Sequence, residues 1–284
     1  MGYSFPRTEV AGVSLSRMII GTNWLAGWSH TGPAADQMIK SRHSTPHTIE
    51  PMFKAYLDNG IDTIMGVISS PASEQIYKAI QIVQEKYGKK LNIIDTPIIN
   101  VDDNAQARRE AEADIKRCKE MGATFCFLHH SSVEQLVDKN QKKIHRLDDY
   151  TKMIRDAGMI PGLSAHMPEI IVYSDLNEYD VQTYIQIYNC MGFMMQVEIE
   201  SVNKIIWEAK KPVMTIKSMA AGRCSPFVGI TFSFSTLRPC DMVTVGAMTA
   251  DEVHEDVEIG MAAIERRRPD LEGRNSPNKT DIIK

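Results

Sequence analysis

Short apolar runs alternate with longer stretches of mixed polarity along most of the chain. The runs have the length of buried strands, and the stretches between them carry apolar residues at helical spacing. The pattern predicts strands at residues 18–21, 61–65, 91–95, 124–129, 161–164, 183–188, 213–216 and 242–245. It predicts helices at residues 45–59, 73–87, 105–121, 148–157, 167–172 and 197–209, and a last helix from Thr249. Strands that alternate with helices form a parallel sheet, and eight such units favour closure, so the predicted fold class is α/β, a single (β/α)8 TIM barrel.

Two segments depart from this rhythm. Residues 24–44 form a long connection, and two tryptophans, Trp24 and Trp28, argue against plain disorder there. We interpret the connection either as a lid over the barrel mouth or as a contact in a homo-oligomer. The tail from Pro269 to Lys284 is polar, and we expect it to pack loosely.

Composition narrows the possible partners. The chain has 284 residues and a net charge of -4, which gives no electrostatic footprint for nucleic acid. No stretch approaches the ~20 apolar residues of a membrane span, and no apolar run has signal-peptide length. The five cysteines form no C-x-x-C pair, so a disulfide framework or zinc ribbon is not expected. We expect a cytoplasmic protein that acts on a small molecule, with neither a nucleic-acid nor a membrane partner.

Several segments occur in an order that resembles a known superfamily. Asn59-Gly60-Ile61-Asp62-Thr63 enters the second predicted strand, and Leu128-His129-His130 ends the fourth. Gly246-Ala247-Met248-Thr249 follows the eighth strand. Over about residues 13–262 the chain resembles the aldo-keto reductases. The resemblance implies a barrel that binds NAD(P)H and reduces carbonyl groups with an Asp, Tyr, Lys and His group.

Most of that catalytic group is absent from this chain. The Asp position falls on Met65, and no Tyr lies between Met65 and Glu74. The Lys position holds Asp95-Thr96-Pro97, so only His129 fits. A Tyr hydroxyl with a pKa of about 10 needs help to donate a proton at neutral pH, and both the donor and its helper are missing.

Other polar residues remain where a barrel places its active site, at the carboxyl ends of the strands. The candidate catalytic residues are His129, His166, Asp95 and Lys217, and the candidate substrate-binding residues are Asn23, Trp24, Trp28 and Asn189. His129 and His130 are adjacent on a predicted strand, so we expect their side chains to face opposite sides. The resemblance favours His129 as the inward residue.

Two loops are predicted to bind an anion, because loops after strands seven and eight of such barrels present backbone N–H groups. The candidate cofactor-binding residues are Ser218, Met219, Gly222, Arg223, Gly246, Ala247, Met248 and Thr249. The anion is a nucleotide phosphate or a sugar phosphate, and the sequence does not separate the two. Asp251 and Glu252 would repel a 2'-phosphate, which argues against selectivity for NADPH.

The roles of two candidate residues stay open. Lys217 is either a Schiff-base nucleophile or a fixed cation for a phosphate or carboxylate, and the resemblance favours the cation. His166 is a base, a polar contact for substrate or nicotinamide, or a ligand of a divalent metal together with Asp95 and His129. The last alternative has no local motif behind it.

Three functions remain at this point. The first is a lyase, aldolase or isomerase acting on a small hydroxy-carbonyl or sugar-like compound, because enolate formation needs a base and a cation rather than a hydride. The second is an NAD(P)H-dependent oxidoreductase with a substituted proton donor. The third is a ligand-binding barrel without catalytic activity.

Overall fold

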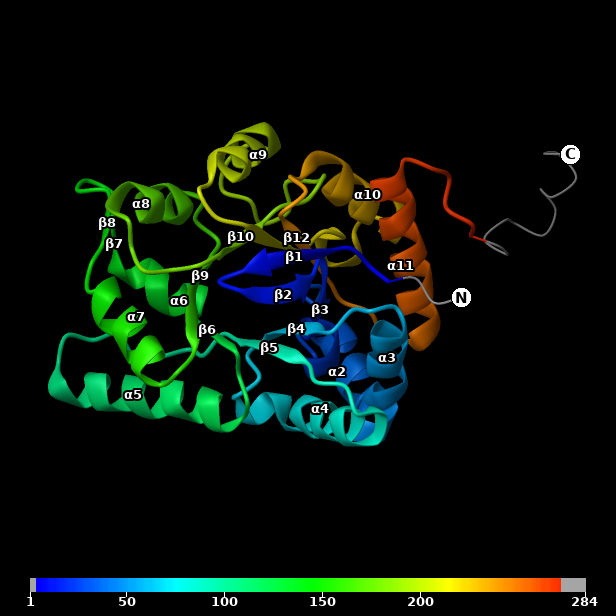
Figure 1. Ribbon diagram of the computed structural model, residues 1–284, viewed down its shortest axis with the longest axis horizontal. Helices are drawn as coiled ribbons and strands as arrows, with labels where there is room; N and C mark the ends of the chain where they lie inside the picture. The colour runs from blue at the N-terminus through cyan, green and yellow to red at the C-terminus, as the bar shows by residue number, and fades with distance from the viewer. Residues whose placement is uncertain (1–3, 272–284) are drawn as a thin grey trace, which may run out of the picture.

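A computed structural model describes residues 4–271 and contains a closed barrel of eight parallel strands. The strands are β3 (Met18–Gly21), β4 (Thr63–Gly66), β5 (Asn92–Asp95), β6 (Phe125–Leu128), β9 (Ile160–Ala165), β10 (Tyr184–Ile187), β11 (Val213–Ile216) and β12 (Met242–Val245). Each overlaps its predicted range, and helices surround the ring of strands (Figure 1). The predicted (β/α)8 barrel is confirmed.

The helix directly before β4 and the longer helices that follow β4 to β12 match the prediction, except for one that was not expected. They are α3 (Pro46–Asp58), α4 (Glu74–Tyr87), α5 (Ala105–Glu120), α7 (Leu147–Asp156), α8 (Glu169–Asn177), α9 (Ile199–Glu208), α10 (Pro226–Thr236) and α11 (Ala250–Glu265). Helix α10 lies between β11 and β12 and packs against α11, and the sequence pattern did not predict it. Its run of Phe, Val, Ile and Thr is typical of strands, although Ser225 caps its N-terminus and Pro226 stands in its first turn.

The connection at residues 24–44 is helical, which corrects the expectation of a long loop. It contains α1 (Asn23–Ala26) and α2 (Pro33–Arg42), and the two helices contact each other. Gly27 ends α1 with a φ of 77°, a conformation that favours glycine. The predicted polar tail lies mostly outside the described residues. Within residues 4–271, no helix combines the length and the apolarity needed to cross a membrane.

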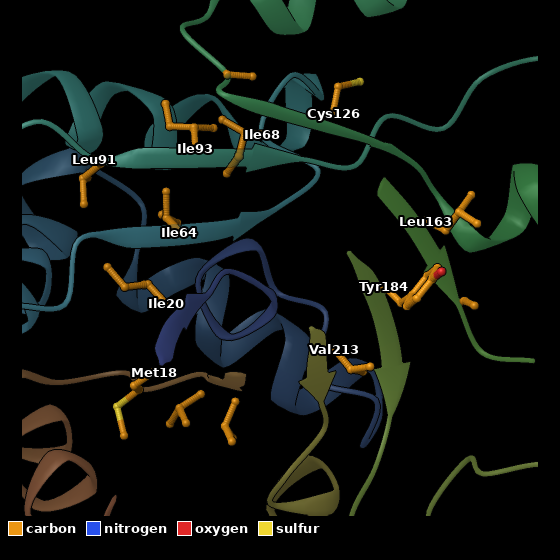
Figure 2. Packing of buried hydrophobic residues seen from close by; sticks show 14 of the residues in the cluster. Met18, Ile20, Ile64, Ile68, Leu91, Ile93, Cys126, Leu163, Tyr184 and Val213 are labelled. Carbon is orange, nitrogen blue, oxygen red and sulfur yellow. The ribbon is translucent and has the colours of Figure 1, made fainter. Parts of the chain in front are cut away.

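The apolar side chains of the strands alternate between two clusters. Ile19, Met65, Ile94 and Met214 belong to a cluster inside the barrel. Their neighbours on the same strands belong to a larger cluster between strands and helices: Met18, Ile20, Ile64, Ile93 and Val213, as Figure 2 shows. Because successive side chains of a strand point to opposite faces, each strand is buried on both sides and reads as a continuous apolar run.

A hairpin lies across the amino-terminal end of the barrel. Strand β1 (Arg7–Val10) pairs antiparallel with β2 (Val13–Ser16), and Val10 and Leu15 join the cluster inside the barrel. The hairpin crosses the centre of the ring in Figure 1. A second, short hairpin pairs β7 (Val137–Asp138) with β8 (Lys143–Ile144). With the amino-terminal end covered, the carboxyl ends of the strands are the end of the barrel that can hold a site.

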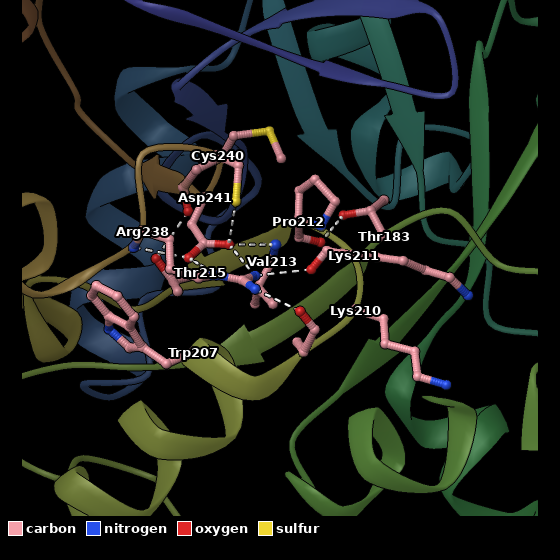
Figure 3. Close-up of polar contacts among 12 residues, drawn as sticks. Thr183, Trp207, Lys210, Lys211, Pro212, Val213, Thr215, Arg238, Cys240 and Asp241 are labelled. Carbon is pink, nitrogen blue, oxygen red and sulfur yellow. Dashed lines mark hydrogen bonds and ion pairs between the residues drawn. The ribbon is translucent and has the colours of Figure 1, made fainter. Parts of the chain in front are cut away.

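A buried ion pair fastens the amino-terminal ends of β11 and β12. The Arg238 guanidinium lies 2.7 Å from the Asp241 carboxylate, and the Asp241 side chain is 0% exposed. The same carboxylate accepts hydrogen bonds from the backbone N–H groups of Val213 and Arg238. Arg238 also donates to the carbonyl oxygens of Ala209 and Lys211 (Figure 3). This network therefore joins the chain before β11 to the chain before β12.

Candidate active site

A cavity of about 370 Å³ opens at the carboxyl ends of the strands. Its polar lining includes Thr96 after β5, His129 and His130 after β6, His166 after β9, and Lys217 after β11. Its apolar lining is formed by Trp24, Trp28, Met65, Val67, Ile98, Ile185, Ile216 and Met219. The cavity therefore lies at the end of the barrel where the sequence places the site, and its lining is mixed.

His129 and His130 both border the cavity, which corrects the prediction that they face opposite sides. Strand β6 ends at Leu128, and His130 begins the short helix α6 (His130–Val133). The two rings therefore lie side by side, with centroids 4.2 Å apart, and the His130 ring stacks on His166 at 3.6 Å. The strand rule fails because the backbone turns into a helix between the two residues.

The tautomer of His129 follows from its contacts. The backbone N–H of Ser131 donates to His129 Nδ1, so this nitrogen carries a lone pair. Burial lowers the pKa of His129 to about 4, helped by the positive charge of His130 when that ring is protonated. At neutral pH the ring is therefore uncharged, with its proton on Nε2. His129 can donate one hydrogen bond to a molecule in the cavity.

Lys217 lies against His30, a residue from the turn between α1 and α2. Lys217 Nζ is 2.8 Å from His30 Nε2, and both side chains line the cavity. Burial lowers the pKa of Lys217 to about 8. The pKa of His30 is also lowered, mainly by burial and to a smaller extent by the positive charge of Lys217. Since His30 itself is exposed, it connects a half-buried amine to solvent.

Asp95 is in the protein interior, outside the cavity lining, which corrects its predicted place in the working set. Its two carboxylate oxygens accept hydrogen bonds from the backbone N–H groups of Ile68 and Ser69, at 3.0 and 2.9 Å. Burial raises its pKa to about 6, and those hydrogen bonds oppose the rise. The carboxylate thus holds the loop after β4, and it does not line the cavity with His129 and His166.

The substrate-binding candidates divide into two groups. Trp24, Trp28 and Asn23 line the cavity, and Asn23 Nδ2 lies 3.3 Å from His30 Nε2. Asn189 does not line it, because the residue is fully buried and bonds within its own loop. Its Oδ1 accepts from the N–H of Phe193, and its Nδ2 donates to the carbonyl oxygen of the same residue. Asn189 therefore shapes the loop after β10.

The predicted anion loop after β12 is satisfied by the protein itself. The backbone N–H of Met248 donates to the Glu252 carboxylate at 2.7 Å, and Thr249 Oγ1 accepts from the N–H of Glu252. Thr249 thus caps the N-terminus of α11, and the Glu252 side chain binds the residue before the cap. Of the four residues predicted there, Gly246 lines the cavity, whereas Ala247, Met248 and Thr249 do not.

The space between the two predicted anion loops holds the Trp24 ring. A Cβ atom added to Gly246 would lie 2.9 Å from this ring, and one added to Gly222 would lie 3.8 Å from it. Arg223 is also engaged, since its guanidinium stacks over the Phe193 ring at 4.0 Å and donates to the His30 carbonyl oxygen. Trp24 and Arg223 thus occupy part of the space between the two loops that are predicted to bind an anion.

Two hydroxyl groups at the cavity have no partner within the protein. Ser218 Oγ and Thr244 Oγ1 are buried, and neither forms a hydrogen bond among residues 4–271. Both residues line the cavity, as does Met219. The two oxygen atoms themselves are shielded from solvent, so a molecule in the cavity reaches them only if neighbouring side chains move.

Sequence reasoning missed two functional candidates, Glu134 and His30. Glu134 lies one helical turn after His130, a spacing of four residues that places both side chains on one face. That spacing was a usable signal. No pattern in the sequence indicated that His30 would reach Lys217, because the contact depends on how α1 and α2 fold over the barrel.

No family model and no curated protein sequence matches the chain. Several solved structures match the chain in fold. A Pseudomonas aeruginosa protein described as an aldo-keto reductase matches with a TM-score of 0.62 at 15% identity, over 93% of this chain and 97% of that one. The fold is that of the aldo-keto reductases. An aldo-keto reductase of the silkworm Bombyx mori matches with a TM-score of 0.59 at 13% identity, over 95% of this chain and 90% of that one.

A third match is an aldo-keto reductase from Klebsiella pneumoniae, solved in complex with NADPH. It has a TM-score of 0.56 at 13% identity and covers 96% of this chain and 92% of that one. At these identities the likeness concerns the fold alone. It confirms the barrel that the sequence resemblance implied, and it leaves the chemistry to the residues of this chain.

Proposed function

We propose that this protein is an enzyme that moves protons on a small hydroxy-carbonyl or sugar-like substrate, in a lyase, aldolase or isomerase reaction. The observation behind the proposal is the cavity itself, which joins a lysine of lowered pKa to a neutral histidine donor. Enolate formation needs a base near the carbon that loses its proton and a donor at the carbonyl oxygen. Lys217 and His129 match these two needs.

Lys217 is the proposed base. General bases work best when their pKa lies near the operating pH, and a value of about 8 meets this condition better than the usual ~10.5 of lysine. The neutral amine takes the proton from the carbon next to the carbonyl, and the electron pair moves into the carbonyl to form an enolate. His30, in contact with Lys217 and exposed on its other side, gives the proton a route to solvent.

His129 is the proposed donor to the developing enolate oxygen. Its Nδ1 is held by the N–H of Ser131, which fixes the proton on Nε2. A neutral imidazole donates a hydrogen bond without giving up its proton, which suits a carbonyl that must be polarised and then released.

A dinucleotide cofactor does not fit the residues present. Its phosphates would compete with the Glu252 carboxylate for the N–H of Met248 and with the Trp24 ring for the space between Gly222 and Gly246. Met65 and Thr96 also line the cavity at positions where the resemblance expects the reductase Asp and Lys. The argument for NAD(P)H-dependent reduction is the fold shared with reductases, one of them solved with NADPH.

Exchange of substrate hydrogen for deuterium tests the proposal without knowledge of the product. The protein is incubated in deuterated buffer with a panel of hydroxy-aldehydes, hydroxy-ketones and sugars, and NMR follows loss of the proton next to the carbonyl. We expect exchange with at least one compound and a decrease on the order of 10²–10⁴-fold in Lys217→Met. Lys211→Met is the matched control, since Lys211 is also partly buried with a lowered pKa but lies outside the cavity lining.

The same panel is run with NADPH and NADH, with oxidation followed by absorbance. Cofactor oxidation without exchange would overturn the proposal and select the reductase. Binding of a compound without exchange or oxidation would select a ligand-binding barrel. Equal activity of Lys217→Met and Lys211→Met would remove Lys217 from the mechanism.

A further inference from the structure

Two histidines that line the cavity and a glutamate beside them bring two nitrogen ligands and one oxygen ligand together. His130, Glu134 and His166 each offer one such atom, and these atoms lie within 4.8 Å of one another. His130 and Glu134 are four residues apart, on α6 and at the start of the 3-10 turn η2 (Glu134–Leu136), so they share one face. His166 comes from the next strand of the barrel, directly after β9.

Glu134 is held in place by the backbone. Its Oε1 accepts hydrogen bonds from the N–H groups of His166 and Met167, at 2.6 and 3.2 Å. Its Oε2 lies 3.9 Å from His130 Nδ1. One oxygen is thus fixed by the protein, while the other faces the imidazole. Such outer contacts orient the carboxylate ligands of metal sites.

We infer that His130, Glu134 and His166 form a binding site for a divalent transition metal ion, with zinc as the best match. Two imidazoles and a carboxylate are a ligand set that zinc uses in catalytic sites, where the remaining position is open to water or substrate. Here His130 and His166 line the cavity, so the open position faces the space where a substrate would bind.

The ligand atoms need only small movements. Zinc–nitrogen and zinc–oxygen bonds of ~2.1 Å at tetrahedral angles separate two ligands by about 3.4 Å, so His130 Nδ1 and Glu134 Oε2 must close by roughly half an ångström. The rings of His130 and His166 are stacked 3.6 Å apart with an interplanar angle of 18°, so their lone pairs lie in two nearly parallel planes and cannot point at one ion. Coordination therefore requires one ring to turn about its Cβ–Cγ bond.

The charges around the cluster are mixed. Lys217 lines the same cavity as His130 and His166, and its positive charge would repel a metal ion. Glu134 supplies the opposing negative charge, and its carboxylate accepts hydrogen bonds from the backbone N–H groups of His166 and Met167. A bound ion would polarise a carbonyl on the His166 side of the cavity, whereas Lys217 is the proposed base that removes the proton.

This site goes beyond the proposed function and is tested without any substrate. Untagged protein is treated with chelator and then titrated with Zn²⁺ by calorimetry and with Co²⁺ by visible absorption, which reports the geometry of bound cobalt. We expect one site per chain and a cobalt spectrum of low coordination number. Glu134→Gln should weaken zinc binding by roughly 100-fold, because it removes the charged ligand while its amide oxygen can still accept from the His166 and Met167 N–H groups.

The matched control is His145→Gln, which removes an imidazole that lies 3.3 Å from the Asp138 carboxylate, away from the cavity lining. It should bind zinc like the wild type. Absence of zinc binding by the wild type, or equal affinities of the wild type and Glu134→Gln, would overturn the site. Because deuterium exchange is measured separately, with chelator and with zinc, a failed metal site leaves the proposed proton transfer standing on its own test.

Discussion

Removing the charge of Asp241 should strongly destabilise the barrel. The Asp241 side chain is fully buried and accepts from the Arg238 guanidinium and from the N–H groups of Val213 and Arg238. Asp241→Asn keeps the shape but turns an NH₂ group toward these donors and leaves a half-buried guanidinium without its counter-ion. Breaking a buried pair from one side costs about 3–5 kcal/mol. At about 2 °C per kcal/mol for a chain of this size, the melting temperature should fall by roughly 6–10 °C.

Thermal and urea unfolding, followed by far-ultraviolet circular dichroism, would measure this loss. The matched control is Asp180→Asn, because Asp180 pairs with Arg155 at the same 2.7 Å while their side chains are 49% and 38% exposed. An exposed pair contributes under about 1 kcal/mol, so the control should melt within roughly 2 °C of the wild type. Equal losses in the two variants would refute the reasoning, since burial is the main difference between the pairs.

Three further changes test the site and its rim. With a pKa of about 8, Lys217 is roughly half neutral at pH ~8, whereas a lysine with a pKa of ~10.5 is under about 1% neutral at that pH. An amine-acylating reagent at pH ~8 should therefore modify Lys217 before surface lysines, and peptide mass spectrometry would show the order of modification. Oxidised glutathione should form a disulfide between Cys190 and Cys224, whose sulfur atoms are 3.9 Å apart, and release two molecules of reduced glutathione. The disulfide-linked peptide should be missing in Cys190→Ser. Glu252→Ala should lower the free energy of unfolding in urea by about 1 kcal/mol, because the N–H of Met248 loses its acceptor, and Glu252→Gln should recover most of it.

The barrel was predictable because its strands are buried on both faces. Each strand reads as an apolar run, and the stretches between runs have helical spacing, so periodicity alone located most elements. Periodicity failed where the residue types of a segment favour a structure other than the one it adopts. Helix α10 consists of residues typical of strands, and its packing against α11 overrides that preference. Residues 24–44 lack a strong apolar period, and their two helices form in contact with each other.

The position of the site was also predictable, but the direction of its side chains was not. His129, His166 and Lys217 lie at the carboxyl ends of strands and reach the cavity, as that position implies. Asp95 has an equivalent position, yet its carboxylate turns to two backbone N–H groups of the loop after β4. Such a choice depends on which donors a neighbouring loop presents, and a single sequence does not show them.

The backbone around Lys217 connects the fold to the proposed chemistry. Lys217, Ala220 and Ala221 have φ values of 64°, 49° and 57°, a left-handed region that costs a residue with a side chain about 1 kcal/mol. A loop that only joined β11 to α10 would be more stable with glycine at these positions. At Lys217 the same backbone turn brings Nζ to within 2.8 Å of His30, at the edge of the cavity. The left-handed backbone at Lys217 is therefore part of how the loop after β11 brings this amine into the cavity, where the proposed proton transfer needs it.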